Sequence, residues 1–171
     1  LDASLAQRRH FPAFNWLKSY SLYTDGLDEW FAENVSSDFT TLRKEAMNLL
    51  QKESELQEIV QLVGPDALPE KEQGILLVTK MFREDFLQQN AFSDLDAFSP
   101  LEKQYLMLKT IFKFYDRMVS SLDLGSQLKG IQEFKCIAKI ARMKEIPNDK
   151  PKEFEKLMKS IDSEFDDLAK E

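Results

Sequence analysis

The stretch RRHFPAFNW, residues 8 to 16, holds two arginines, the chain's single histidine, a proline and three large aromatic residues. Side chains of these types bind anions, transfer protons or stack on a planar ligand. A lone histidine such as His10 is more often structural than catalytic. Arg8 and Arg9 are expected to pair with acids at a boundary between domains or subunits. The cluster is interpreted as a core strand, as one wall of a ligand site, or as both.

Motifs that carry catalysis are missing from the sequence. It contains no GxxxxGK[ST] or GxGxxG phosphate loop, no GxSxG and no HExxH, and it has only five glycines. Its one cysteine, Cys136, excludes an intrachain disulfide and a cysteine-based zinc site, and is expected in the core. Carboxylates such as Glu84 and Asp85 are assigned to solvated helix faces. We expect no catalytic residue and no metal ligand in this chain.

Composition and charge limit the class of protein. The 171 residues suit one domain, and 43% of them are apolar. Thirty acids against 23 bases give a net charge of -7, which argues against a nucleic-acid surface. The longest apolar run, Ile75 to Val78, cannot span a bilayer, and no signal peptide precedes it. We therefore expect a cytoplasmic chain without membrane insertion, and the opening LDASLAQ is typical of an excised piece. A basic run at helical spacing is expected on a solvated helix face: Lys135, Lys139, Arg142 and Lys144.

The elements that must position these residues are mostly helices. Residues 1–24 are expected as strand or loop, and Asp25-Gly26 marks a turn. Apolar residues at i, i+3 and i+4 then predict a short helix at 27–35 and a longer helix, or a broken pair, that ends at Gly64. The next helix begins with Pro69 in its first position and fades at Asn90.

Further helices are predicted in the second half of the chain. Ser99-Pro100-Leu101-Glu102 has the pattern of a capping box, with Pro100 in the first helical position, and the helix after it is the most apolar one. Another helix is expected over residues 128–141, and a last one from about Asp149. The predicted fold class is an all-α helical bundle over residues 25–171, preceded by a strand or loop remnant over residues 1–24.

Three stretches in order resemble one family, the catalytic A subunit of V-type and archaeal-type rotary ATPases. SLAQRRHFPAFNWLKSYSLYT resembles the end of its nucleotide-binding domain, and EIVQLVGPDALPEKE, residues 58–72, is similar to a helix–turn–helix of its C-terminal domain. REDFLQQNAFSDLDAFSP, residues 83–100, looks like the segment that follows. The likeness extends to about residue 120. Ser99 and Phe14 depart from the family pattern, where cysteine and an aliphatic residue are common. The HFPAFNW and FLQQNAF runs favour the A subunit over two related proteins, the F-type β subunit or the non-catalytic B subunit.

The resemblance implies an adenine pocket closed by two aromatic residues, here Phe11 and Phe92, with Phe98 as a third wall. A π-face accepts any base, and stacking contributes roughly 1–3 kcal/mol per base. Without the resemblance, Phe11 and Phe92 would be interpreted as core aromatics. Other aromatics nearby are expected to pack in the protein: Phe14, Trp16 and Tyr20.

The resemblance also implies that the turn after Gly64 touches the central rotor shaft. A stiff turn with dispersed charges rather than a large apolar contact suits a surface that slides. The residues assigned to this contact are Asp66, Ala67, Leu68, Pro69, Glu70, Lys71 and Glu72.

The full-length protein implied by the resemblance hydrolyses or synthesises ATP, coupled to proton or sodium transport. It alternates with B subunits in a ring around the rotor shaft, in the soluble sector peripheral to the membrane. It binds ATP or ADP with Mg²⁺ mostly through residues outside these 171, so the fragment alone is not expected to be active. Two alternatives stay open: a freestanding helical interaction domain, and a non-catalytic paralogue that binds nucleotide without hydrolysing it.

Overall fold

The protein was analysed as a computed structural model that describes residues 1–170, and over this range helices are joined by loops with no β-strand. The all-α class is confirmed. The α-helices are α1 (Ala3–Gln7), α2 (Asp28–Asn34), α3 (Phe39–Val63), α4 (Glu70–Met81), α5 (Asp94–Ala97), α6 (Leu101–Asp123), α7 (Leu128–Gln132), α8 (Lys135–Ala141) and α9 (Lys152–Leu168). Short 3₁₀ helices are η1 (Asp25–Leu27), η2 (Pro65–Ala67) and η4 (Met143–Glu145), and η3 (Phe82–Leu87) is a π-helix.

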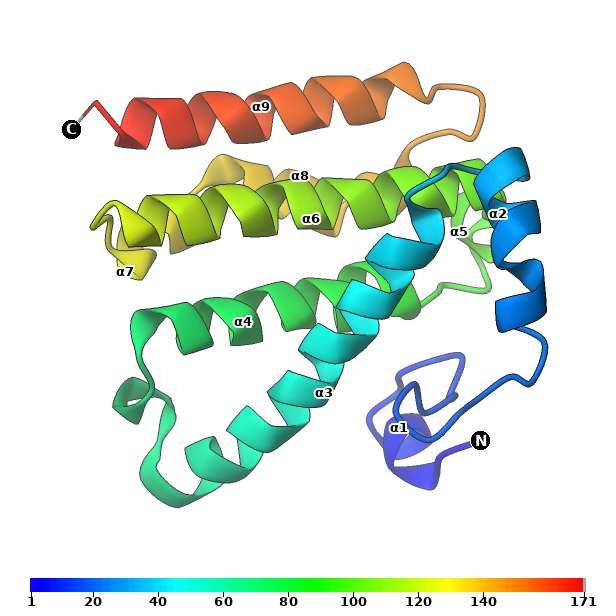
Figure 1. Ribbon diagram of the computed structural model, residues 1–171, viewed down its shortest axis with the longest axis horizontal. Helices are drawn as coiled ribbons and strands as arrows, with labels where there is room; N and C mark the ends of the chain where they lie inside the picture. Colours follow the sequence, from blue (N-terminus) through cyan, green and yellow to red (C-terminus); the bar gives the residue numbers. More distant parts are fainter. Residues whose placement is uncertain (171) are drawn as a thin grey trace.

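Helix α6 lies at the centre of the bundle. It packs between α9 and α4, and α3 crosses α4 and α6 at an angle (Figure 1). Ile111, Phe114 and Met118 recur at spacings of three and four along α6, and none of them is exposed to solvent. They join one core cluster with residues of α3, α4, α8 and α9. Burial of each large apolar side chain contributes about 1.5–3 kcal/mol, so this stripe holds the bundle together.

The N-terminal segment forms a loop with one short helix rather than a strand. Asp2 caps α1, because its Oδ1 accepts hydrogen bonds from the amide of Ser4 at 2.8 Å and from the Ser4 hydroxyl at 2.6 Å. Its Oδ2 accepts another from Asn15 at 2.8 Å, and its own amide donates to the carbonyl of Ala13. These donors, Ser4 first, hold the pKa of Asp2 well below its usual range. The segment therefore satisfies its polar groups by folding onto itself.

Most helix ends follow the sequence pattern, and three differ from it. Gly64 ends α3 with φ +86°, as expected, and α3 is continuous. The capping box at Ser99 is wrong: Pro100 occupies the N-cap position with ψ 154°, and the Ser99 hydroxyl has no hydrogen-bond partner. Pro69 likewise lies at the N-cap of α4 and not at its first helical position. The helix expected over 128–141 is broken into α7 and α8, because Phe134 adopts an extended backbone at ψ 135°.

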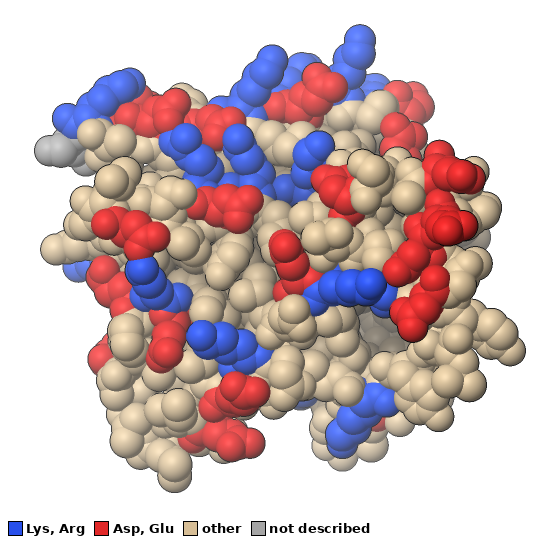
Figure 2. Space-filling view, in the orientation of Figure 1, with Lys and Arg blue, Asp and Glu red and all other residues tan. Residues whose placement is uncertain are grey.

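The surface carries mixed charge. Acidic side chains gather on the side where α2 lies, whereas bases and acids alternate over α9 and its neighbour α6 (Figure 2). Lys113 and Asp162 pair across α6 and α9 at 2.9 Å, and Arg117 bonds Asp166 alongside them. Cys136 is fully buried, as expected. No helix within residues 1–170 is long and apolar enough to cross a membrane.

Candidate functional site

Two segments far apart in the sequence meet at one end of the molecule. The backbone amide of Gln89, just after η3, donates to the carbonyl of Phe11 at 2.8 Å. The Gln88 side chain reaches the carbonyl of Arg9 at 3.5 Å. Two of the three stretches that carry the family resemblance are therefore in direct contact.

The three phenylalanines assigned to the ligand site are exposed. Phe92 is 100% exposed, Phe98 76% and Phe11 52%, so none of them is a core residue. The structure brings the backbones of Phe11 and of the loop that carries Phe92 and Phe98 together. It shows no ring-to-ring contact among the three within residues 1–170. Exposed aromatic rings on adjoining segments are available to stack on a planar ligand.

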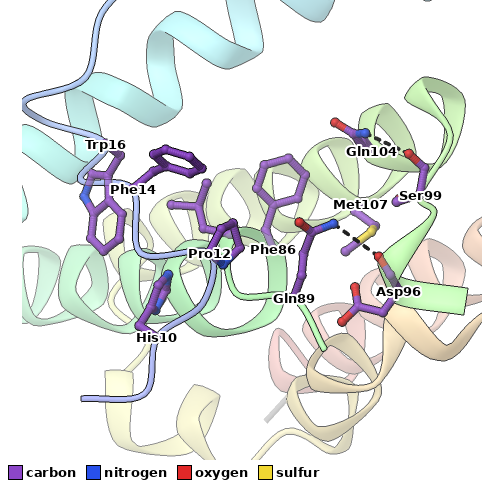
Figure 3. Close-up of a pocket in the computed structure, with 11 residues that line it drawn as sticks. His10, Pro12, Phe14, Trp16, Phe86, Gln89, Asp96, Ser99, Gln104 and Met107 are labelled. Atoms are coloured by element: carbon purple, nitrogen blue, oxygen red, sulfur yellow. Dashed lines mark hydrogen bonds between the residues drawn. The ribbon is translucent and has the colours of Figure 1, made fainter. Parts of the chain in front are cut away.

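A cavity of about 300 Å³ lies between these segments. Side chains of the N-terminal stretch line one side of it, and side chains of η3, the following loop and α6 line the other (Figure 3). The lining residues include His10, Pro12, Phe14, Trp16, Phe86, Gln89, Asp96, Ser99, Gln104 and Met107. Phe14 and Trp16, expected only to pack, form part of this cavity. Phe14 and Tyr20 are both exposed, so the expectation of packing is wrong for these two residues.

A buried carboxylate organises the loop from Gln88 to Ser99. Asp96 is 5% exposed, and its Oδ2 accepts a hydrogen bond from the amide of Asn90 at 2.6 Å. The side chain of Asn90 in turn accepts from the amide of Phe92 at 3.0 Å. Gln89 donates from its side chain to the carbonyl of Asp96 at 3.2 Å (Figure 3). Sequence reasoning missed Asp96, although an aspartate inside a polar loop is a typical acceptor for loop amides.

His10 lies at the inner side of the N-terminal segment. It is buried and packs against Trp16 with ring centroids 5.3 Å apart. Burial, followed by the positive charges of Arg83 and Arg8, lowers the pKa of His10. A neutral imidazole packed on an aromatic ring agrees with the structural role expected for this histidine. Arg8 and Arg9 form no ion pair with the residues that the structure describes.

The turn assigned to rotor contact lies at a separate corner, where α3 ends and α4 begins (Figure 1). Asp66 and Ala67 are exposed, but Leu68 is buried in a small cluster with Leu56 and Ile75. Exposed Leu62 and Val63 add an apolar component to this corner, which the expected pattern of dispersed charges did not include.

Two charged residues of the same turn bind neighbouring elements. A side-chain oxygen of Glu70 accepts from the amide of Leu128 at 3.3 Å, and Lys71 pairs with Asp123. These contacts tie the start of α4 to α7 and to the end of α6. Asp66 and Glu72 form no ion pair within residues 1–170.

Comparison with known proteins shows the family of the chain. Residues 28–131 match the family described as the C-terminal domain of V and A type ATP synthase. The chain is 55% identical over its full length to the A subunit of the A-type ATP synthase from Methanopyrus kandleri. It is 47% identical over 99% of its length to the A subunit from Thermococcus onnurineus, and 48% identical over its full length to that of Staphylothermus marinus. It spans about 29% of the length of each of these relatives. The chain therefore belongs to the family of C-terminal domains of V and A type ATP synthases.

Proposed function

We propose that the chain is the C-terminal part of the A subunit of a V/A-type rotary ATPase, which hydrolyses or synthesises ATP. Residues 1–24 are the tail of the nucleotide-binding domain and residues 25–171 are the helical C-terminal domain. In the full-length protein, Phe11, Phe92 and Phe98 form aromatic walls around the adenine base. The observation that carries this proposal is the hydrogen bond from Gln89 to Phe11, which joins the two exposed aromatic segments.

The residues present fit the base of a nucleotide better than its phosphates. Exposed rings offer stacking surfaces to adenine. The sequence contains no phosphate loop, and the described residues hold no group of three or more metal-ligating side chains. We assign the triphosphate and Mg²⁺ to parts of the full-length protein outside these 171 residues. Mg²⁺ there neutralises the phosphate charge, while this chain orients the base.

The test is ATP binding by the full-length protein in which Phe92 is replaced. Phe92→Ala is expected to weaken ATP binding by about 5- to 150-fold, the equivalent of 1–3 kcal/mol of stacking. Phe92→Tyr keeps the π-face and is expected to bind like the parent. Leu124→Ala removes another largely exposed apolar side chain, just after the far end of α6, and serves as the control. Unchanged affinity in Phe92→Ala would contradict the adenine site.

The turn from Asp66 to Glu72 is proposed to contact the rotor shaft, in a ring where A and B subunits alternate. Support comes from its position at the corner between α3 and α4, remote from α1 (Figure 1), and from the buried Leu68 that stiffens it. Replacement of Asp66 and Glu72 by alanine in the assembled enzyme is expected to alter coupling of hydrolysis to rotation and to leave ATP affinity intact. Glu70 is kept, because it binds Leu128. Loss of ATP affinity would refute the assignment.

The two alternatives left open by the sequence differ in how well they explain these observations. A freestanding interaction domain predicts that Phe11 and Phe92 are distant or buried, whereas their segments are bonded and both rings are exposed. A non-catalytic paralogue accounts equally well for the adenine surface. A phosphate-loop lysine in the full-length protein would favour the catalytic subunit over it.

A further inference from the structure

Lys103, in the first turn of α6, is a buried cation next to the loop that carries Phe92. It is 4% exposed, and its Nζ donates to the carbonyls of Leu95 and Lys144, each at 2.7 Å. The negative charge of Asp96 acts on it as well. A buried charge is costly unless hydrogen bonds and a counter-charge compensate it, and both are present here. Lys103 therefore ties α5, on the C-terminal side of the loop that carries Phe92, to α6 and to η4.

Lys144, in η4, fastens the other end of the same loop. Its Nζ donates to the carbonyl of Gln88 at 2.6 Å and to that of Glu84 at 2.9 Å. Carbonyls in the last turn of a helix have no partner within the helix, so an ammonium group there replaces water. The expectation of a solvated face is wrong for Lys144, which is half-buried, although the other three bases of that run are exposed.

Together the two lysines form a continuous bridge. Lys103 bonds the backbone of Lys144, and the side chain of Lys144 bonds the end of η3. Their acceptors Gln88 and Leu95 bracket the segment that includes Phe92. No other pair of side chains described for residues 1–170 donates to both ends of this segment.

The position of Phe92 is set by the hydrogen bonds of its loop and not by packing of its side chain. Its ring is fully exposed, so no packing of the side chain within the described residues fixes it. Its amide bonds the side chain of Asn90, whose own amide bonds Asp96. Those contacts begin inside the segment whose end carbonyls, Gln88 and Leu95, the lysines hold, and they reach the residue just after Leu95. The site binds a planar base more tightly when the loop already holds the Phe92 ring in the geometry for stacking.

We propose that Lys103 and Lys144 are positioning residues for Phe92: they fix both ends of residues 88–95 and thereby raise the affinity of the site for the base of ATP. This inference rests on the proposed adenine site. Neither lysine is assigned a contact with nucleotide. Release of either end lets the loop sample geometries in which the ring does not meet the base, which lowers the apparent affinity by the fraction of competent loops.

The experiment uses the assembled ATPase, with Lys103→Met and Lys144→Met introduced into the full-length protein. Lys144→Met is the second variant in case removal of the buried Lys103 prevents folding. Lys144→Arg keeps donors for the two carbonyls, and Lys139→Met removes an exposed charge from α8 as a matched control. Both Lys→Met variants are expected to accelerate hydrogen exchange of the Asn90 and Phe92 amides without nucleotide. They are also expected to raise the KM for ATP about tenfold with little change in kcat, whereas the arginine variant and the control stay near the parent.

A double-mutant cycle with Phe92→Ala separates this inference from the adenine site itself. If the lysine acts through Phe92, Lys144→Met adds little to the KM of a chain that already carries Phe92→Ala. Full additivity would overturn the inference, as would unchanged exchange of the loop or unchanged KM in Lys144→Met while Phe92→Ala raises KM. If Phe92→Ala itself leaves KM unchanged, the adenine site fails, and the inference fails with it.

Discussion

The amide of Gln89 lies 2.8 Å from the carbonyl of Phe11, and this hydrogen bond joins the N-terminal segment to the loop after the π-helix. A π-helix shifts the hydrogen-bond register by one residue and often occurs at functional sites. Here it ends α4 directly before Gln88, where the chain turns toward Phe11. The contact explains how two motifs from opposite halves of a helical chain reach one surface.

Phe92 and Phe98 contribute little to folding, because both are largely exposed. Alanine at either position is expected to change the free energy of unfolding of the 171-residue chain by no more than about 0.5 kcal/mol. Phe82→Ala is the matched control: that ring is 1% exposed, and its loss is expected to cost about 3–5 kcal/mol. Urea unfolding measures both. A large loss in Phe92→Ala would show that the ring is packed.

Gly64 has a backbone conformation that other residues rarely adopt, with φ +86° and ψ 161°. Gly64→Ala is expected to destabilise the chain by about 1–3 kcal/mol, because a Cβ strains this conformation. Nothing lies within 4 Å of a Cβ built on Gly64, so strain and not a clash is the cause. Gly26→Ala, with equally open space and no positive φ, is expected to be close to neutral. Thermal unfolding of both variants would distinguish them, and equal melting temperatures would refute the strain.

Arg83 and Glu53 form a partly buried ion pair at 3.0 Å between η3 and α3. Burial outweighs the arginine and raises the pKa of Glu53. Arg83→Met leaves that carboxylate without its partner and is expected to cost on the order of 3 kcal/mol at pH 7.

Further variants test whether the Arg83 and Glu53 side chains are coupled. The double variant Glu53→Met/Arg83→Met is expected to recover much of the loss, since no lone buried charge remains. Arg142→Met breaks the exposed pair with Glu145 and is expected to leave the free energy of unfolding close to that of the parent. Denaturant unfolding of these chains, of the parent and of Glu53→Met alone reports the coupling, and additive losses in the Arg83→Met and Glu53→Met single variants would argue against it.

Asp85, expected on a solvated helix face, is instead partly buried in η3, and it makes the free energy of unfolding depend on pH. Burial raises the pKa of Asp85 from 3.8 to about 6, with Lys144 and Lys80 opposing the change. The folded chain therefore binds this proton more tightly than the unfolded chain. The stability that protonation of Asp85 contributes to the folded chain is present in full below about pH 4. It is lost as the pH rises through about 6.

Asp85→Asn removes this titration. Its stability relative to the parent is expected to rise between pH 4 and pH 7, by on the order of 2–3 kcal/mol. Both chains contain His10, so the effect of its titration is the same in each and cancels in the difference. Urea unfolding at several pH values measures the difference, and a difference independent of pH would contradict the raised pKa of Asp85.

The sequence alone determined the position of most of the long helices. Apolar spacing of three and four residues depends only on local order along the chain, so α6 and α9 follow from it, and Gly64 ends α3 because glycine tolerates a positive φ. Periodicity alone favours a core position for Phe11 and Phe92, and only the resemblance of the HFPAFNW and FLQQNAF runs to the ATPase A subunit indicated a ligand-facing one. Both rings lie on the surface.

The tertiary structure decided which polar groups are buried and which helices break. Phe134 interrupts the helix expected over 128–141 and packs on Phe165 of α9, with ring centroids 4.8 Å apart. Lys103 is buried because carbonyls from two other elements surround its amine, and Asp96 is buried because the amide of Asn90 turns toward it. Such partners lie outside the periodic pattern of the element itself, so the local sequence of a lysine or an aspartate does not show whether the fold will supply them.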